Sequence, residues 1–130
     1  MILDSSAVIA VLRTEPEARS FIAAIKLAEI RRISAVSYVE SAIVIDGGRD
    51  PIASRRFDDF FRATQISIET VTPKQAEIAR AAYRDFGKGR HKAGLNFGDC
   101  FAYALAKDLD EPLLFKGRDF PQTDVEVVPL

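Results

Sequence analysis

Four acidic residues, widely separated along the chain, could together bind a metal ion. They are Asp4, Glu40, Asp99 and Asp119. Four carboxylates in one cleft repel one another and raise each other's pKa values, which a folded protein tolerates mainly when a cation lies among them. Ligation by oxygen alone favours Mg²⁺, with Mn²⁺ as an alternative, over zinc, because the chain has only one histidine and one cysteine. Such a site predicts hydrolysis of a phosphodiester by metal-activated water, without a nucleophilic side chain.

Each acid taken alone also has a structural interpretation. Asn96 is a candidate N-cap of an apolar helix, and Asp99, three residues later, could serve as a capping carboxylate. Glu40 could likewise close a capping box, and Asp119 could be a turn residue. Asp4 is harder to explain in this way, because a carboxylate directly after a buried strand needs a partner. The combination of the four is therefore more specific than any one of them.

The segments that must position these acids alternate between short apolar strands and helices. Strands are expected at residues 1–4, 31–36, 66–71, 113–115 and 125–128. Helices are expected from capping signals at residues 14–17, 37–40, 50–51, 72–75 and 96–99, and another directly after the first strand. Strands separated by helices predict one α/β domain, residues 1–130, with a parallel-rich sheet and helices on both faces. The acids follow strands or begin helices, so all four are expected at the carboxyl edge of that sheet, where ligand sites of such folds lie.

Composition narrows the class of protein. The chain has 130 residues, of which 48% are hydrophobic and 28% charged, as in an ordinary globular domain. No apolar run is long enough to cross a bilayer, and the N-terminus lacks the basic region of a signal peptide. A single cysteine, Cys100, fits a reducing compartment, so we expect a cytoplasmic protein with no membrane partner. The net charge of −1 gives no overall basic field, but the remainder is mildly basic once the four acids are set aside.

The chain resembles a PIN domain, and specifically the VapC toxins of bacterial toxin–antitoxin pairs. The segments that carry this resemblance are Met1–Ala7, Ser37–Glu40, Leu95–Cys100, Leu113–Phe120 and Thr123–Val125. The metal-binding acids of that family correspond to the four acids named above, and none of them is missing. The small hydroxyl two residues after the first aspartate corresponds to Ser6, which is expected to hydrogen-bond a neighbouring acid or a metal-bound water. Asp124 matches a position that is acidic in many relatives and is a weaker candidate for site support.

The resemblance implies a Mg²⁺-dependent endoribonuclease that acts as the toxin of a type II toxin–antitoxin pair. It implies RNA as the substrate, a cognate VapB-type antitoxin as the partner, and a homodimer. In that family the antitoxin supplies the DNA-binding part, so contact with DNA is expected only through the antitoxin.

A glycine-rich basic loop precedes the helix that carries Asp99. Lys88, Arg90 and Lys92 lie in this loop, residues 87–94. Glycines allow the backbone to approach a phosphate closely, and the basic side chains could bind the RNA backbone beside the metal. The alternative is a flexible loop whose charges are simply solvated.

Other functions compete with the nuclease. A response-regulator receiver also gathers acids at a parallel sheet edge, but the strand expected at residues 66–71 does not end in aspartate. A phosphatase of the haloacid dehalogenase type needs a second aspartate two residues after the first, where this chain has Ser6. The remaining alternative is a PIN-like module that binds RNA or a protein without cutting.

Overall fold

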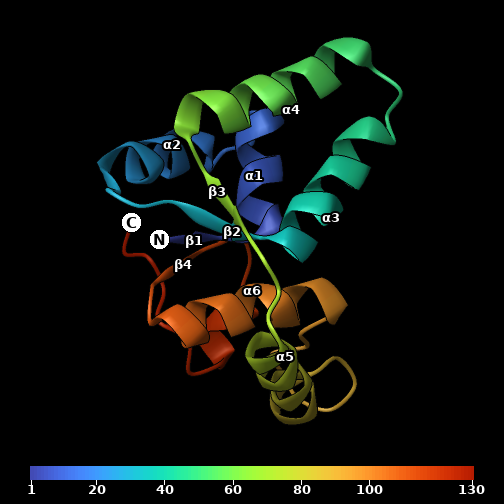
Figure 1. Cartoon of the computed structure of the whole chain (residues 1–130), viewed down its shortest axis with the longest axis vertical. Helices are drawn as coiled ribbons and strands as arrows, with labels where there is room; N and C mark the ends of the chain where they lie inside the picture. Colours follow the sequence, from blue (N-terminus) through green and yellow to red (C-terminus); the bar gives the residue numbers. More distant parts are fainter.

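Four short parallel strands form a single sheet in the computed structural model, which describes all 130 residues (Figure 1). The strands are β1 (Ile2–Leu3), β2 (Arg32–Ser34), β3 (Ser67–Glu69) and β4 (Leu113–Leu114). Their order in the sheet is β3-β2-β1-β4, and every neighbouring pair is parallel. The predicted parallel sheet is confirmed, with strands shorter than the apolar runs suggested.

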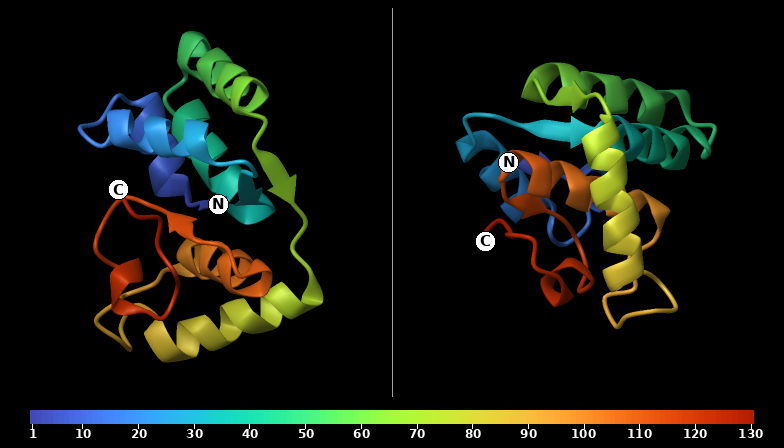
Figure 2. Two further views of the ribbon diagram at one scale, coloured as in Figure 1. Left: turned by 90° about the vertical axis from the view of Figure 1, so that its left-hand side faces the viewer. Right: turned by 60° about the horizontal axis from the view of Figure 1, so that its bottom comes forward.

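Six helices cover the two faces of this sheet. They are α1 (Ser5–Leu12), α2 (Ala18–Leu27), α3 (Ala35–Asp46), α4 (Pro51–Thr64), α5 (Pro73–Phe86) and α6 (Phe97–Leu109), with a short 3₁₀ helix η1 (Phe120–Gln122) near the end. Helices α1 to α4 lie on one side, and α5 and α6 lie on the other (Figures 1 and 2). The α/β architecture with helices on both faces therefore agrees with the prediction from the sequence.

The core is divided by the sheet because successive side chains of a strand point to opposite faces. Ile2 and Leu113, which are paired in register, pack with α5 and α6. Leu3, Ile33 and Leu114 pack on the opposite face, with α1 to α4. All five side chains are almost completely inaccessible to solvent, so both faces of the sheet are fully used for packing.

The carboxyl ends of the central strands lead directly into helices or a loop. Helix α1 begins two residues after β1 ends, and α3 begins immediately after β2. The backbone N–H of Asp4 still donates to the carbonyl of Leu114, at 2.9 Å, so the end of β1 is held beside the end of β4. This short connection fixes the direction of α1 and leaves Asp4 at the edge of the sheet.

Local helix signals were correct where one residue could act alone. Asp50 caps α4 through Ile52 N–H at 3.0 Å, with Pro51 at the first helical position. Thr72 caps α5 through Gln75 N–H at 3.1 Å, but the Gln75 side chain donates to Asp108 and closes no capping box.

Several sequence predictions about capping boxes and strands were wrong. The expected capping box at residues 14–17 does not form: α2 begins only at Ala18, and Glu17 makes no capping hydrogen bond. Thr14 adopts a positive φ of 53°, which ends α1 in a turn instead of beginning a helix. The expected strand at residues 125–128 is reduced to an isolated parallel bridge between Leu113 and Val127.

No helix of the structure has both the length and the apolar character needed to span a membrane.

Candidate active site

Asp4 is the most deeply buried acid of the chain. Its side chain is only 2% exposed, and Asp4, not the following serines, caps α1. Its Oδ2 accepts hydrogen bonds from the N–H of Ser6 at 3.0 Å and from the Ser6 hydroxyl at 2.6 Å. Its Oδ1 is buried and has no hydrogen-bond partner. Burial, assisted by the nearby charge of Glu40, raises the pKa of Asp4 above its ordinary value, although the bonds from Ser6 oppose this.

Ser6 connects Asp4 to the loop after β4. While its hydroxyl donates to Asp4, the same oxygen accepts from the backbone N–H of Lys116 at 2.9 Å. The Lys116 side chain in turn pairs with Glu15 at 2.9 Å and with Glu17 at 3.3 Å. The expected contact between Ser6 and a neighbouring acid is present, and it ties the loop that leads to Asp119 to the start of α1.

Glu40 lies within α3 and not at its start. Ser34 caps this helix by accepting from Val36 N–H at 3.3 Å, so the capping box expected at residues 37–40 is wrong. The Glu40 carboxylate is thus free of a capping role, and its Oε1 accepts from the hydroxyl of Ser5 at 2.6 Å. Ser5 was not predicted as a site residue. The only feature of the sequence that could have indicated it is its position directly after Asp4, in the first turn of the helix that packs beside α3.

Asp99 combines the two roles that the sequence left open. Asn96 caps α6 by accepting from Asp99 N–H at 2.9 Å, and Asp99 Oδ2 accepts from Asn96 N–H at 3.0 Å, which completes a capping box. Burial raises the pKa of Asp99 to about 7, and the charges of Asp4, Glu40 and Asp119 add to this effect against the opposing bond from Asn96. A capping carboxylate near a helix N-terminus normally has a lowered pKa, so burial, with the neighbouring charges, outweighs that effect here.

Asp119 is the exposed member of the group. It stands at the start of η1, where its side chain makes no capping bond. Its charge contributes to the raised pKa of Asp99, which places it in the same electrostatic environment. The charges of Asp4, Glu40 and Asp119 thus all act on Asp99, so the four predicted acids share one electrostatic environment, with Asp119 on an exposed loop.

The four acids do not form a ready-made metal cage. No three His, Cys, Asp or Glu side chains of the structure are arranged so that they could already hold a metal ion. The donor set nevertheless fits a hard cation: every donor is a carboxylate oxygen, Asp4 Oδ1 is buried without a partner, and burial raises the pKa of Asp4 and Asp99. A divalent ion would satisfy the unpaired oxygen and offset the mutual repulsion.

The remaining candidates make their contacts with residues outside this group of acids. Asp124 accepts from the Tyr103 hydroxyl at 2.6 Å and from Lys107 Nζ at 3.1 Å, so both of its oxygens are engaged by side chains of α6. Lys88, Arg90 and Lys92 are all exposed, and no ion pair holds them. The Arg90 guanidinium lies over the ring of Tyr83, 5.4 Å from its centre.

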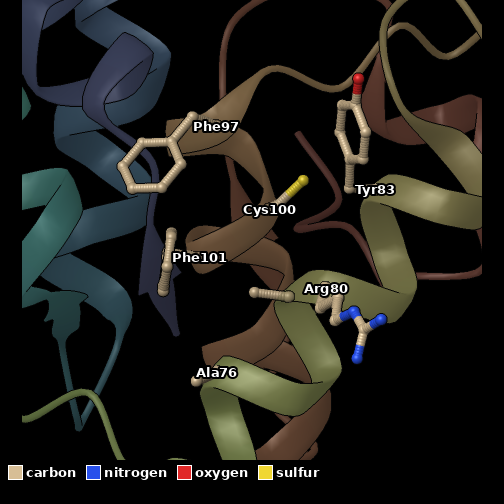
Figure 3. A pocket seen from close by; sticks show the side chains of 7 residues that line it. Ala76, Arg80, Tyr83, Phe97, Cys100 and Phe101 are labelled. Carbon is tan, nitrogen blue, oxygen red and sulfur yellow. The ribbon is translucent and has the colours of Figure 1, made fainter.

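Apolar hollows flank the acids on the surface. One of about 400 Å³ lies between α5 and α6 and is lined by Phe97 and Phe101 of α6 and by Arg80 and Tyr83 of α5 (Figure 3). Another of about 600 Å³ runs along α3. Phe97 lines both hollows and is 72% exposed, which is unusual for a phenylalanine beside a charged site.

Comparison with known proteins gives consistent matches over the whole chain. The PIN domain family matches residues 1–126. Ribonuclease VapC28 of Mycobacterium tuberculosis is 53% identical over 127 residues, which are 97% of this chain and 96% of that protein. Ribonuclease VapC of Mycolicibacterium smegmatis is 45% identical over 128 residues, 98% of this chain and 99% of that protein.

Two solved structures share the fold. The crystal structure of Mycobacterium tuberculosis VapC20, a sarcin-ricin loop cleaving toxin, superposes with a TM-score of 0.76 at 14% identity, over 98% of this chain and 97% of that one. A toxin–antitoxin complex from Klebsiella pneumoniae gives a TM-score of 0.73 at 18% identity, over 99% of this chain and 97% of that one. At these identities the likeness concerns the arrangement of helices and strands.

Proposed function

The chain belongs to the PIN domain family, and from this premise we propose that its four clustered acids form the catalytic site of a divalent-metal-dependent endoribonuclease. With VapC ribonucleases among its relatives, it is a toxin ribonuclease of a toxin–antitoxin system. RNA is therefore its substrate and an antitoxin its partner. We expect the antitoxin to be of the VapB type and to make any contact with DNA.

The buried, unpartnered Oδ1 of Asp4 is the observation that carries the proposal of a metal site. An unpaired buried carboxylate oxygen is costly, and natural proteins rarely retain one without a function. Asp99 and Glu40 add further negative charge in the same place. Mg²⁺ is the ion expected from the all-oxygen donor set, and Mn²⁺ is the alternative.

Asp4, Glu40, Asp99 and Asp119 are proposed to hold the ion. A divalent ion in such a site lowers the pKa of a bound water and neutralises charge on a phosphate. Ser6 and Ser5 orient the carboxylates of Asp4 and Glu40 through their hydrogen bonds. Asp119, on an exposed loop, is proposed to adjust to the bound ion and substrate.

Proton release from Asp99 should make the binding of a divalent cation measurable. Since its pKa is about 7 without a metal, a substantial fraction of Asp99 carries a proton at neutral pH. Ligands must be deprotonated, so binding of a divalent cation should release protons. Calorimetric titration of Mg²⁺ in two buffers with different ionisation enthalpies would count them.

RNA cleavage by the purified chain tests the function. Structured RNA incubated with the protein should be cut in Mg²⁺ and left intact in EDTA, and cleavage should return when Mg²⁺ is added in excess. An Asp4→Asn variant, purified in the same way, controls for contaminating nucleases. Cleavage that persists in EDTA or in this variant would contradict the metal-dependent site. Binding of RNA without cleavage under every condition would instead favour the non-catalytic PIN-like module.

We also propose that the apolar surface around Phe97 is the interface of a homodimer. Val39 and Ile43 of α3 are 51% and 66% exposed beside it, and the flanking hollows make the surface uneven enough to receive a second copy. Replacing Ile43 with Lys should shift the sedimentation coefficient from dimer to monomer. The matched control is Ile52→Lys, at an equally exposed isoleucine on α4 that lines neither hollow. A monomeric native chain would contradict this proposal.

A further inference from the structure

Gly98 occupies a position where the backbone itself does not require glycine. It is the second residue of α6, follows Phe97 and precedes Asp99, and is buried. Its φ is not in the left-handed region, unlike that of Gly89, Gly94 or Gly117. Within a helix, glycine is less favourable than alanine because it loses more conformational freedom on folding. Some feature outside the α6 backbone must therefore explain the missing side chain.

The Glu40 carboxylate occupies the space that a side chain at residue 98 would need. A methyl group added at Gly98 would overlap Glu40 Oε2 and would lie 2.6 Å from both Cδ and Oε1. The three atoms nearest to such a methyl group all belong to the end of the Glu40 side chain. The closest approach at this position is therefore to one carboxylate.

Glu40 also contacts α1. The Ser5 hydroxyl donates to Oε1 at 2.6 Å, while the same carboxylate lies against the bare backbone of α6 at Gly98. Two contacts from two different helices therefore define where the charge of Glu40 lies. Asp99 is the next residue after Gly98, so the same turn of α6 supplies one acid and the space for another.

We propose that Gly98 is a positioning residue whose missing side chain allows the Glu40 carboxylate to lie against the first turn of α6, beside Asp99. The significance of this for catalysis rests on the proposed function, in which Glu40 holds the metal. The packing relation between Gly98 and Glu40 does not depend on that function and can be tested separately.

A double-mutant cycle of Gly98→Ala and Glu40→Ala provides the test. Melting temperatures are measured without metal or RNA. In the Glu40→Ala background, Gly98→Ala should raise the melting temperature by about 2 °C, because alanine favours the helix and meets no carboxylate. In the native background the same substitution should lower it, because the Glu40 side chain must leave its place. Equal shifts in both backgrounds would overturn the proposal.

Folding failure would also be informative. If Gly98→Ala fails to fold but the double variant folds, the obstruction is the Glu40 side chain, as proposed. If both fail to fold, the obstruction lies elsewhere and the proposal is wrong. Gly48→Ala is the matched control, because an added Cβ there would meet only the Ile45 carbonyl at an ordinary 3.5 Å. Its shift in melting temperature should be the same with and without Glu40.

Metal binding supplies a second measurement. By calorimetry, Gly98→Ala should weaken Mg²⁺ binding about tenfold, and it should have no further effect once Glu40 is removed. If the native chain binds no Mg²⁺ while the melting temperatures behave as described, the proposed function fails and the positioning role stands. If Mg²⁺ binds normally to Gly98→Ala, the positioning role is overturned and the metal site stands.

Discussion

The pKa values of the acids at the carboxyl edge of the sheet are shifted in the opposite direction from those of Asp108 and Asp124, which contact α5 and α6 and are called the outer acids below. Burial raises the pKa of Asp4 and Asp99 at the edge. Hydrogen bonds from Lys74 and Gln75 lower the pKa of Asp108, and a hydrogen bond from the Tyr103 hydroxyl lowers that of Asp124.

The difference lies in the partners and not in the residue type. Asp108 is paired with Lys74 at 2.9 Å, and Asp124 is paired with Lys107 at 3.1 Å. No lysine or arginine is paired with Asp4 or Asp99. The outer acids stabilise the fold in their charged form, whereas the charged forms of Asp4 and Asp99 cost stability. Carboxylates whose charged forms destabilise the fold are expected at a site that binds a cation.

The largest expected effect is on the rate of RNA cleavage, which should distinguish the acids at the sheet edge from the outer acids. Asp4→Asn should reduce RNA cleavage by about 1000-fold, because the amide leaves the shape of the site intact but removes a charged ligand. Asp124→Asn should leave the cleavage rate within about threefold of the native value. Initial rates on one RNA, at saturating Mg²⁺, would measure both. Comparable losses in the two variants would mean that the outer acid also belongs to the active site.

The next effect concerns the stability of the metal-free protein. The folded-state pKa of Asp99, about 7, lies above the ordinary 3.8, so the folded state binds more protons between these pH values. Stability conferred at low pH is therefore lost as the pH rises through this window. Asp99→Asn abolishes the loss, and its amide oxygen can still accept from Asn96 N–H. In urea denaturation with EDTA, its advantage should grow from near zero at pH 4 to about 1–2 kcal/mol at pH 8, allowing for partial exposure.

Added Mg²⁺ provides the control for this measurement. The native chain should regain stability at pH 8 as the ion binds, whereas the variant, with one ligand fewer, should regain less. An advantage that is already present at pH 4, or that does not change with pH, would show that Asp99 is not destabilised by burial and its neighbours.

Substitutions in the basic loop, residues 87–94, test whether this loop contributes to RNA binding. Replacing Lys88, Arg90 and Lys92 with Ala should lower the slope of log affinity against log salt by about 2, as expected for lost contacts with single-stranded RNA. Binding is best measured in an Asp4→Asn background, where RNA stays intact. Replacement of Arg49, Arg55 and Arg56, exposed at the far end of the α3–α4 hairpin, is the matched control. An unchanged salt slope would favour a solvated loop.

The smallest expected effect is on the outer acids. Because hydrogen bonding lowers the pKa of Asp124 in the folded state, its charge stabilises the fold above pH 3.8, and this contribution is lost as the pH falls through the lowered value. Asp124→Asn should therefore cost about 0.5–1 kcal/mol at pH 7 and nothing once the pH lies well below the lowered pKa of Asp124. Thermal denaturation at several pH values would show this. A cost that persists in acid would assign the effect to packing around Tyr103 and not to the charge.

Local signals were enough to predict most of the fold. The caps at Asp50, Thr72 and Asn96 depend on hydrogen bonds within a single helical turn, so they are encoded by adjacent residues. The parallel sheet followed from strands that alternate with helices. The same local reasoning misplaced the start of α3, because both Ser34 and Ser37 could cap it, and only packing against the sheet selects between them.

The amino-acid sequence by itself indicated which acids could act together: Asp4 and Asp119 follow strands, Asp99 lies in the first turn of α6, and Glu40 lies in the helix that follows β2. Only the tertiary structure decided the contacts of each acid. The Ser5 hydroxyl donates to Glu40, Gly98 leaves space for the Glu40 carboxylate, and Asp124 accepts a hydrogen bond from Tyr103. The physical reason is distance along the chain. Capping acts across a few residues, whereas contacts such as that between Ser5 and Glu40 exist only once the register of the sheet and the packing of α1, α3 and α6 are set.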